Sequence, residues 1–238
     1  SAGPVDLSLL VRDKDQMIGH FRQSFHVQAP KDAGIAVFRG KATFVASDEP
    51  DIVALVVADS DGNTNLVYAK QVLIASGAAP NRSAFEGLEL AATSNELLDL
   101  TVLPKRVGVI GAGYIALEFA GILRGLGSEV SVFYRGDLPL RGFDEGVRNR
   151  LVTAMKLQGI ELFPNSDFKS IRQQGEAFEL HTAQGSHTFD FVLNATGRSP
   201  NTQGLGLENI GLRTGPACEI EVNKYSHTGI KGVYAVGD

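Results

Sequence analysis

The stretch VGVIGAGYIALEFAG, residues 107–121, decides the fold. Branched apolar residues precede its glycines and an apolar-periodic segment follows them, so we expect a buried strand, a tight turn and a helix. Gly111, Gly113 and Ala116 give the pattern G-x-G-x-x-A. Gly111 permits the turn, Gly113 lets the backbone approach a pyrophosphate, and Ala116 lets helix and strand pack closely. The helix start offers free N–H groups to phosphate, and we therefore predict a dinucleotide site.

Strand and helix patterns alternate around this turn. The segments EVSVFY (129–134), IELF (160–163), FELHT (178–182) and FDFVLNAT (189–196) have strand patterns, whereas 144–158 has the stripe Val147, Leu151 and Met155 of a helix. Strand, helix, strand, helix, strand indicates parallel pairing with right-handed crossovers. We expect this part of the chain to form a βαβ domain.

The chain before residue 99 has a different pattern. Residues 5–25 place Leu10, Met17, Phe21 and Phe25 near helical spacing. Strand patterns follow in IAVFRG, KATFVA, DIVALVVA and NLVYAKQVLIAS, and successive strands with short turns predict an antiparallel meander. The turn DSDGNTN lacks the glycine and glutamate that a calcium loop needs at those spacings, so a hairpin is expected. TSNE at 93–96 predicts a capping box that starts a short helix.

The end of the second strand bears on which dinucleotide binds. Enzymes that bind NAD place an acidic residue there, to bond the ribose hydroxyls. This strand instead ends in Phe133, Tyr134 and Arg135, and Arg141 follows in the next loop. Two guanidinium groups can clamp a 2′-phosphate through charged hydrogen bonds. The alternative is that both arginines lie in a solvated loop, but the missing acid favours NADPH.

Composition limits the other classes of function. The net charge of −5 gives no reason to expect nucleic acid as a partner. No apolar run reaches membrane-spanning length, so no membrane partner is expected. The single cysteine, Cys218, excludes a dithiol redox centre within the chain and fits a cytoplasmic location. The five histidines show no metal-ligand spacing, and no metal is expected.

Several segments resemble one family. GAGYIALEFAGILRGLGSEVSVFYRGDLPLRGFD (111–144) resembles the NADPH site of the glutathione reductase type, within the pyridine nucleotide–disulfide oxidoreductases. VLIASGAAP (72–80), NATGRSPNT (194–202) and TGIKGVYAVGD (228–238) are similar to further family segments, with Ser76 replacing the usual threonine in the first. The resemblance extends from about residue 35 to residue 238.

The resemblance implies an α/β fold and a set of site residues. A Rossmann-like NADPH-binding domain (99–225) would be inserted in an incomplete FAD-binding domain, with a helix and β-meander in 1–98 and a return strand in 226–238. The implied catalytic residues are Tyr114, which would cover the nicotinamide pocket, and Glu118, which would bond the nicotinamide amide. The implied cofactor-binding residues are Gly111, Gly113, Tyr114, Ile115, Ala116, Glu118, Arg135, Arg141, Ala195, Thr196, Gly197, Arg198, Ser76, Gly77 and Asp238, the last contacting the flavin.

The implied parent enzyme is a homodimer that transfers a hydride from NADPH, through FAD and a redox disulfide, to oxidised glutathione. The flavin fingerprint, the C-x-x-x-x-C pair and the dimerisation domain of that family do not occur in these 238 residues. We therefore expect the chain to bind NADPH, to hold FAD weakly and to be inactive alone. Two alternatives stay open: an isolated NADPH-binding module, and a piece of another NADPH-dependent thiol or mercuric reductase.

Overall fold

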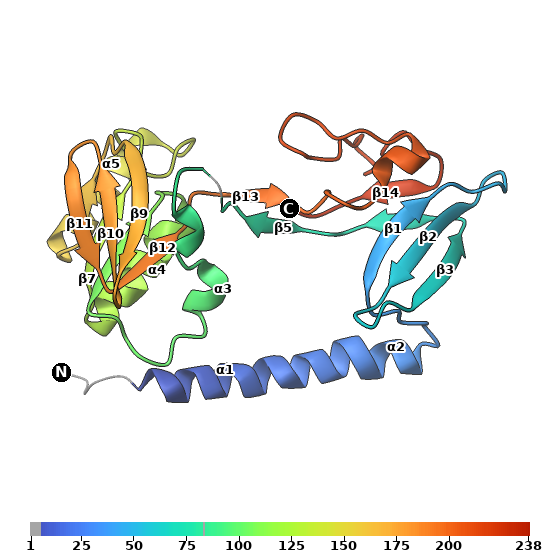
Figure 1. Ribbon diagram of the computed structural model, residues 1–238, viewed down its shortest axis with the longest axis horizontal. Coiled ribbons are helices and arrows are strands. Elements are labelled where there is room, and N and C mark those ends of the chain that lie inside the picture. Colours follow the sequence, from blue (N-terminus) through green and yellow to red (C-terminus); the bar gives the residue numbers. More distant parts are fainter. Residues whose placement is uncertain (1–5, 83) are drawn as a thin grey trace. The chain divides into compact units, whose positions relative to one another are not determined.

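The glycine turn lies between β6 (Arg106–Ile110) and α4 (Tyr114–Leu126) in the computed structural model, which describes residues 6–82 and 84–238 (Figure 1). The strand β6 belongs to a four-stranded sheet in the order β12-β6-β7-β8, in which all pairs are parallel. The other strands are β7 (Glu129–Phe133), β8 (Glu161–Phe163) and β12 (Phe191–Asn194). The predicted parallel βαβ arrangement is confirmed.

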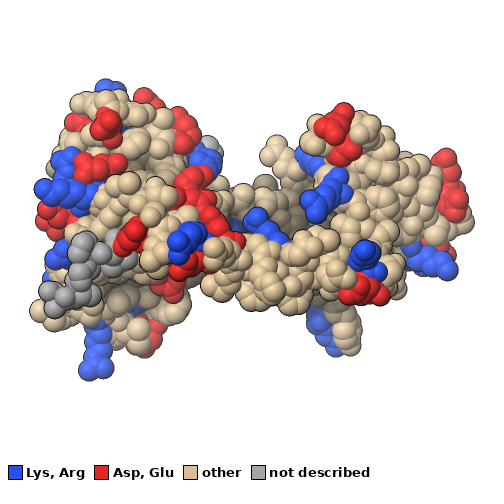
Figure 2. All heavy atoms as spheres, turned by 90° about the horizontal axis from the view of Figure 1, so that it is seen from below, with Lys and Arg blue, Asp and Glu red and all other residues tan. Residues whose placement is uncertain are grey.

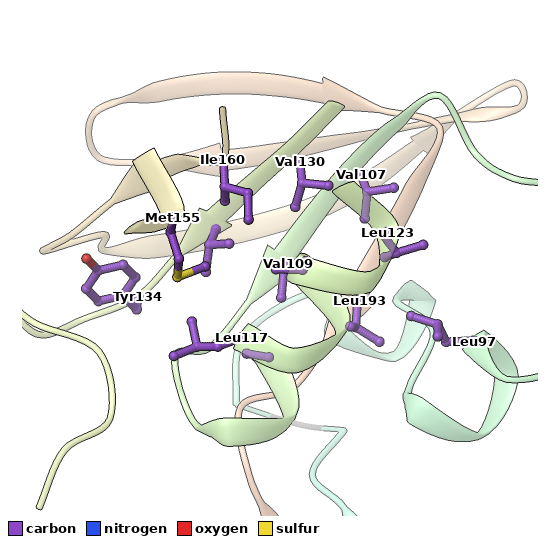
Figure 3. Packing of buried hydrophobic residues seen from close by; sticks show 13 residues of the cluster. Leu97, Val107, Val109, Leu117, Leu123, Val130, Tyr134, Met155, Ile160 and Leu193 are labelled. Carbon is purple, nitrogen blue, oxygen red and sulfur yellow. The ribbon is translucent and has the colours of Figure 1, made fainter. Parts of the chain in front are cut away.

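One face of this sheet packs against helices. Alternate residues of the strands, such as Val107 and Val109, are fully buried against Ala116, Ala120 and Leu123 of α4 (Figure 3). The helix α4 ends at Gly127, whose left-handed backbone fits glycine. The second helix, α5 (Glu145–Leu157), begins after Asp144, whose carboxylate accepts a hydrogen bond from the Val147 N–H. Met155 is buried on the predicted stripe of α5, but Val147 at its other end is exposed.

An antiparallel sheet covers the other face. Its order is β11-β10-β9, with the strands β9 (Phe168–Gln174), β10 (Ala177–Thr182) and β11 (Gly185–Phe189). Ile171, Leu180 and Phe189 pack against Ile110 and Phe133 of the parallel strands. Gly108 leaves room for the Phe189 ring, since a Cβ there would lie 2.6 Å from a ring carbon. This sheet thereby buries the second face of the parallel strands.

Two strand predictions in this region were incomplete. The strand β9 was not predicted. FDFVLNAT belongs to two strands rather than one, because β11 ends at Phe189 and β12 begins at Phe191, with Asp190 between them. The Asp190 carboxylate accepts hydrogen bonds from the Arg106 N–H and guanidinium, and Arg106 holds its pKa below the ordinary value. This ion pair fixes the start of β6 next to the start of β12.

The N-terminal helix is longer than predicted. It comprises α1 (Leu7–Arg22), a π-helical segment (Gln23–Gln28) and α2 (Ala29–Asp32), and residue 5 lies outside the described residues. The apolar side chains Leu10, Met17, Phe21 and Phe25 are all exposed, so their helical spacing marks no buried face of this chain. Lys14 donates to the Leu98 carbonyl at 3.2 Å and pairs with Asp99, which follows the short helix α3 (Ser94–Leu97).

The predicted meander is confirmed with corrected strands. It consists of β1 (Lys41–Val45), β2 (Val53–Ala58) and β3 (Thr64–Ala69), paired antiparallel. IAVFRG (35–40) is not a strand, and NLVYAKQVLIAS divides into β3 and β4 (Val72–Ile74). The turn DSDGNTN is a hairpin in which the Asp59 carboxylate accepts from the Asp61 and Asn63 N–H groups. The strand β4 pairs in parallel with β14 (Val233–Ala235).

The chain divides into two compact units. The first contains the residues up to His20 and Pro80–Gly197, and the second contains Phe21–Ala79 and Arg198–Asp238. The first unit begins before residue 99 because Ala92 adds to β12, exchanging hydrogen bonds with Val192 and Asn194. It ends before residue 225 because Leu207 and Leu212 pack with Phe44 of the second unit. The assignment of 99–225 to NADPH and of the flanking residues to FAD stays a prediction.

Short elements complete both units. They are β5 (Ala78–Pro80), which pairs with β13 (Arg198–Pro200), and the 3-10 turns η2 (Leu88–Leu90) and η3 (Leu207–Ile210).

Acidic and basic side chains are interspersed on the face in Figure 2. Within the part of the chain that the structure describes, no helix is long and apolar enough to cross a bilayer.

Candidate functional site

A cavity of about 800 Å³ lies at the carboxyl ends of β6 and β7. Ligands of open α/β sheets bind at this edge, outside the carboxyl ends of the strands. Most of its lining comes from the glycine turn and from the loop after β7, which we call the arginine loop (135–143). The lining residues are Asn81, Ala84, Gly111, Ala112, Gly113, Tyr114, Tyr134, Arg135, Gly136, Leu138, Leu140, Arg141, Phe143, Phe168 and Thr196.

The two glycines of the turn have different surroundings. Gly111 has a φ of +121°, and a Cβ added there would lie 2.2 Å from the Ala195 carbonyl oxygen. Gly113 has an ordinary φ of −77°, and a Cβ there would meet no atom within 4 Å. Gly111 is therefore required by the fold, whereas Gly113 leaves open space in the cavity. The tight turn predicted for Gly111 is observed, and the approach of a pyrophosphate to Gly113 stays a prediction.

The start of α4 is suited to an anion. Gly113 is the N-cap residue and offers no side chain to the first N–H groups of the helix. Such groups, together with the positive end of the helix dipole, bind phosphate. Ala116 is completely buried, as expected for close packing of helix and strand, and Tyr114 is exposed at the rim of the cavity.

The arginine loop brings two cations to the cavity. Arg135 and Arg141 are both exposed and both line it. Neither makes an ion pair with any residue that the structure describes. Tyr134 precedes them with its ring buried, and this burial raises the pKa of the phenol, so the strand end carries no negative charge at neutral pH. The cavity thus has unneutralised positive charge where an NAD site has a carboxylate.

Hydrogen bonds fix this loop to its neighbours. The Asn165 N–H donates to the Gly136 carbonyl at 3.2 Å, and the Asn165 side chain donates to the Asp137 carboxylate at 2.9 Å. Further along, the Leu140 N–H donates to the Ala112 carbonyl at 2.8 Å. The last bond joins the arginine loop directly to the glycine turn, so the two parts of the cavity wall are coupled.

A buried asparagine organises the third wall. Asn194, at the end of β12, is 3% exposed and donates from its amide to the Asn81 carbonyl. Its side-chain oxygen accepts from the N–H and the hydroxyl of Thr196, at 3.1 and 2.8 Å. Thr196 is thereby held at the cavity. Sequence reasoning named Thr196 but missed Asn194, and it missed Asn81 and Phe168, which approach from distant parts of the chain.

The family model described as "Pyridine nucleotide-disulphide oxidoreductase" matches residues 9–238. The chain belongs to this family. Its segments had resembled that family, and the match confirms the resemblance over nearly the whole chain.

The relatives of this chain include glutathione reductases and mercuric reductases. It is 37% identical over 230 residues to a glutathione reductase of Burkholderia cepacia, a match that covers 96% of this chain and 49% of the relative. It is 34% identical over 244 residues to a mercuric reductase of Lysinibacillus sphaericus, covering 100% of this chain and 43% of the relative. The chain thus spans about half the length of the curated relatives it matches.

Solved structures confirm the α/β fold. The Cu(II) complex of the HOCl-induced flavoprotein disulfide reductase RclA from Escherichia coli superposes with a TM-score of 0.88 at 25% identity, covering 96% of this chain and 51% of that one. LpdA from Mycobacterium tuberculosis superposes with a TM-score of 0.87 at 27% identity, covering 98% and 52%.

Not every predicted site residue lies at the cavity. Glu118 is exposed one helical turn after Tyr114 and does not line it. Ile115 is half-buried, and Ala195 donates its N–H to the Ile110 carbonyl. Gly197 is exposed, and its carbonyl accepts from the Asn81 N–H. The roles assigned to these residues stay predictions.

Another group of predicted residues meets in the second unit. Ser76, Gly77 and Asp238 line a cavity of about 380 Å³. The Arg198 side chain lies beside it, 3.3 Å from the Asp238 carboxylate and bonded to the Ala78 carbonyl. The assignment of Asp238 to the flavin, and of the other three residues to cofactor binding, also stays a prediction. Cys218 is exposed in a turn, and among the described residues no cluster of His, Cys, Asp or Glu is suited to a metal ion.

Proposed function

We propose that this chain is the NADPH-binding portion of an FAD-dependent disulfide reductase. Family membership supports a cofactor of the pyridine nucleotide class. The observation that carries the choice of NADPH is the pair Arg135 and Arg141, which line the cavity without a carboxylate partner among the described residues. A 2′-phosphate is a dianion that would satisfy both guanidinium groups, whereas the 2′-hydroxyl of NADH would leave them unneutralised.

The residues present fit this cofactor. The first N–H groups of α4 would hold the pyrophosphate, with Gly113 leaving the room for it. Arg135 and Arg141 would hold the 2′-phosphate, and Tyr114 would cover the nicotinamide from the rim. Glu118 would bond the nicotinamide amide, for which its exposed position on α4 leaves it accessible. When bound, NADPH supplies a hydride, and the chain's part is to orient its nicotinamide.

For the parent enzyme we propose reduction of oxidised glutathione by a homodimer in the cytoplasm. The name of the Burkholderia cepacia relative supports this substrate. A second candidate is a mercuric reductase, because relatives of that name match the whole chain at 34% and 31% identity. In either enzyme, the cavity at β6 and β7 would hold the electron donor and not the acceptor.

The test is calorimetric titration of the chain with NADPH and, separately, NADH. Two charged hydrogen-bonding contacts predict that NADPH binds about a hundredfold more tightly. An Arg135→Ala/Arg141→Ala variant should lose this preference by binding NADPH more weakly, with NADH affinity nearly unchanged. Arg172→Ala/Arg213→Ala is the matched control, because it removes two exposed arginines elsewhere and the same net charge. Equal affinity of the wild-type chain for both dinucleotides would refute the proposal.

A further inference from the structure

Arg148 lies on α5 and forms hydrogen bonds with the arginine loop. Its Nε donates to the Pro139 carbonyl at 2.6 Å, and its Nη2 donates to the Leu138 carbonyl at 2.9 Å. Pro139 is buried and Arg148 and Leu138 are half-buried, so both bonds are partly shielded from water. A guanidinium is a rigid fork of donors, and here it spans two consecutive carbonyls of one loop.

We propose that Arg148 is a positioning residue for the choice between NADPH and NADH. It holds the arginine loop in the conformation in which Arg135 and Arg141 face the cavity. The inference rests on the proposed function and names a determinant of selectivity outside the cavity lining, since Arg148 is not among the residues that line it.

The other attachments of the loop leave its centre to Arg148. Asn165 binds the loop at Gly136, and Ala112 binds it at Leu140. Leu138 and Pro139 lie between these points, and Arg148 bonds the carbonyls of both. Without those bonds, the central residues would regain backbone freedom that binding would have to remove again. Arg141 follows this segment after Leu140 and would be held less firmly in its direction.

The positive charge of Arg148 would contribute to the selectivity in addition to its hydrogen bonds. Arg148 makes no ion pair with the described residues, so its charge is available to the field at the loop. The nearby carboxylates of Asp137 and Asp144 accept hydrogen bonds only from neutral groups, the Asn165 amide and the Val147 N–H, and they keep their negative charge. The positive charge of Arg148 opposes theirs and favours the doubly charged 2′-phosphate. A lysine at position 148 would keep this charge without the fork, and it therefore separates the two contributions.

The experiment compares Arg148→Met, Arg148→Lys and Arg150→Met by calorimetric titration with NADPH and NADH. Arg150 is the matched control, because it is exposed on the same helix and its replacement removes the same charge. We expect Arg148→Met to weaken NADPH binding about tenfold and Arg148→Lys about threefold, with NADH affinity changed less than about twofold. Arg150→Met should bind both dinucleotides like the wild type.

Three results would overturn the inference: equal effects of Arg148→Met and Arg150→Met, equal losses of NADPH and NADH affinity, or full NADPH affinity in both Arg148 variants. Melting temperatures show whether each variant folds. Should Arg148→Met not fold, Arg148→Lys decides alone, and an unchanged NADPH-to-NADH ratio in it refutes the inference. If the wild-type chain prefers NADPH and Arg148→Met binds NADPH equally well, the proposed function stands and only the role of Arg148 is refuted.

Discussion

Two glycines two positions apart, Gly111 and Gly113, differ in what the fold requires of them. Gly111 combines a φ of +121° with contact to the Ala195 carbonyl, so no other side chain fits its place in the fold. Gly113 has neither constraint, and its missing side chain leaves space at the start of α4. The same residue type therefore serves the backbone at one position and the cavity at the other.

The variants Gly111→Ala and Gly113→Ala test this separation. Gly111→Ala should lower the free energy of unfolding by about 3 kcal/mol, because it adds backbone strain and overlap with a carbonyl oxygen. Gly113→Ala should change the free energy of unfolding by less than about 0.5 kcal/mol, since its φ and its surroundings accept a methyl group. It should nevertheless weaken NADPH binding at least about tenfold, because the methyl group would occupy the approach of the pyrophosphate.

Urea denaturation and calorimetric titration measure the two effects. Each variant serves as the control for the other, since both add one methyl group to the same turn. The assignment of roles would be contradicted by a Gly113→Ala chain that unfolds more easily than Gly111→Ala, or by one that binds NADPH as the wild type does.

At the scale of elements, a capping box anchors the segment beside β12. The Glu96 carboxylate accepts hydrogen bonds from the Thr93 N–H and hydroxyl at 2.7 and 2.5 Å, and it pairs with Arg82 at 2.8 Å. These bonds, with those of Thr93 first in importance, lower the pKa of Glu96 from its ordinary value of 4.5 to about 2. The neighbouring residue Ala92 exchanges backbone bonds with β12, so the box stabilises the edge that leads to Asn194.

This pKa predicts how stability depends on pH. Because folding lowers the pKa of Glu96, its contribution is fully present above pH 4.5 and is lost as the pH falls toward 2. Glu96→Gln should therefore lower the free energy of unfolding by about 1 kcal/mol at pH 7. The effect is no larger because the carboxylate is partly exposed to solvent. The difference from wild type should shrink below pH 4.5 and vanish as the pH falls through about 2.

Urea denaturation of both proteins across this pH range makes the measurement. Glu89→Gln is the control, because Glu89 is an exposed carboxylate nearby that accepts no hydrogen bond from the described residues. A constant difference between Glu96→Gln and wild type from pH 7 to pH 2 would show that the charge of Glu96 is not what stabilises the box.

Elements with a local cause were the ones the sequence predicted well. The capping box, the glycine turn and the helix end at Gly127 each depend on residues within a few positions of one another. Strands depend on partners far along the chain, so the pattern of IAVFRG predicted a strand that finds no partner, and the polar β9 was missed although β10 pairs with it. The same reason explains the site: Gly111 and Arg141 were found by spacing, whereas Asn81 was not.

At the scale of the whole molecule, the chain has a cavity at the carboxyl ends of β6 and β7 but only part of the length of its relatives. The two cavities lie one in each unit, and Asp238, which was predicted to contact the flavin, lines the smaller one. Reduction of a disulfide by this family type also needs a pair of thiols, whereas this chain has the single, exposed Cys218. The proposed binding of NADPH can therefore be tested apart from turnover of a disulfide.

The last prediction concerns this separation. The chain as purified should show no flavin absorbance, because the family's flavin pyrophosphate turn is not in its sequence. Mixed with NADPH, FAD and oxidised glutathione, it should not consume NADPH faster than free FAD does, because no dithiol within the chain can pass electrons to the substrate. An intact glutathione reductase assayed in parallel is the positive control, and the calorimetric titration establishes that the chain binds NADPH in the same buffer. A yellow protein would refute the weak hold on FAD, and turnover that depends on glutathione would identify the chain as an enzyme in its own right.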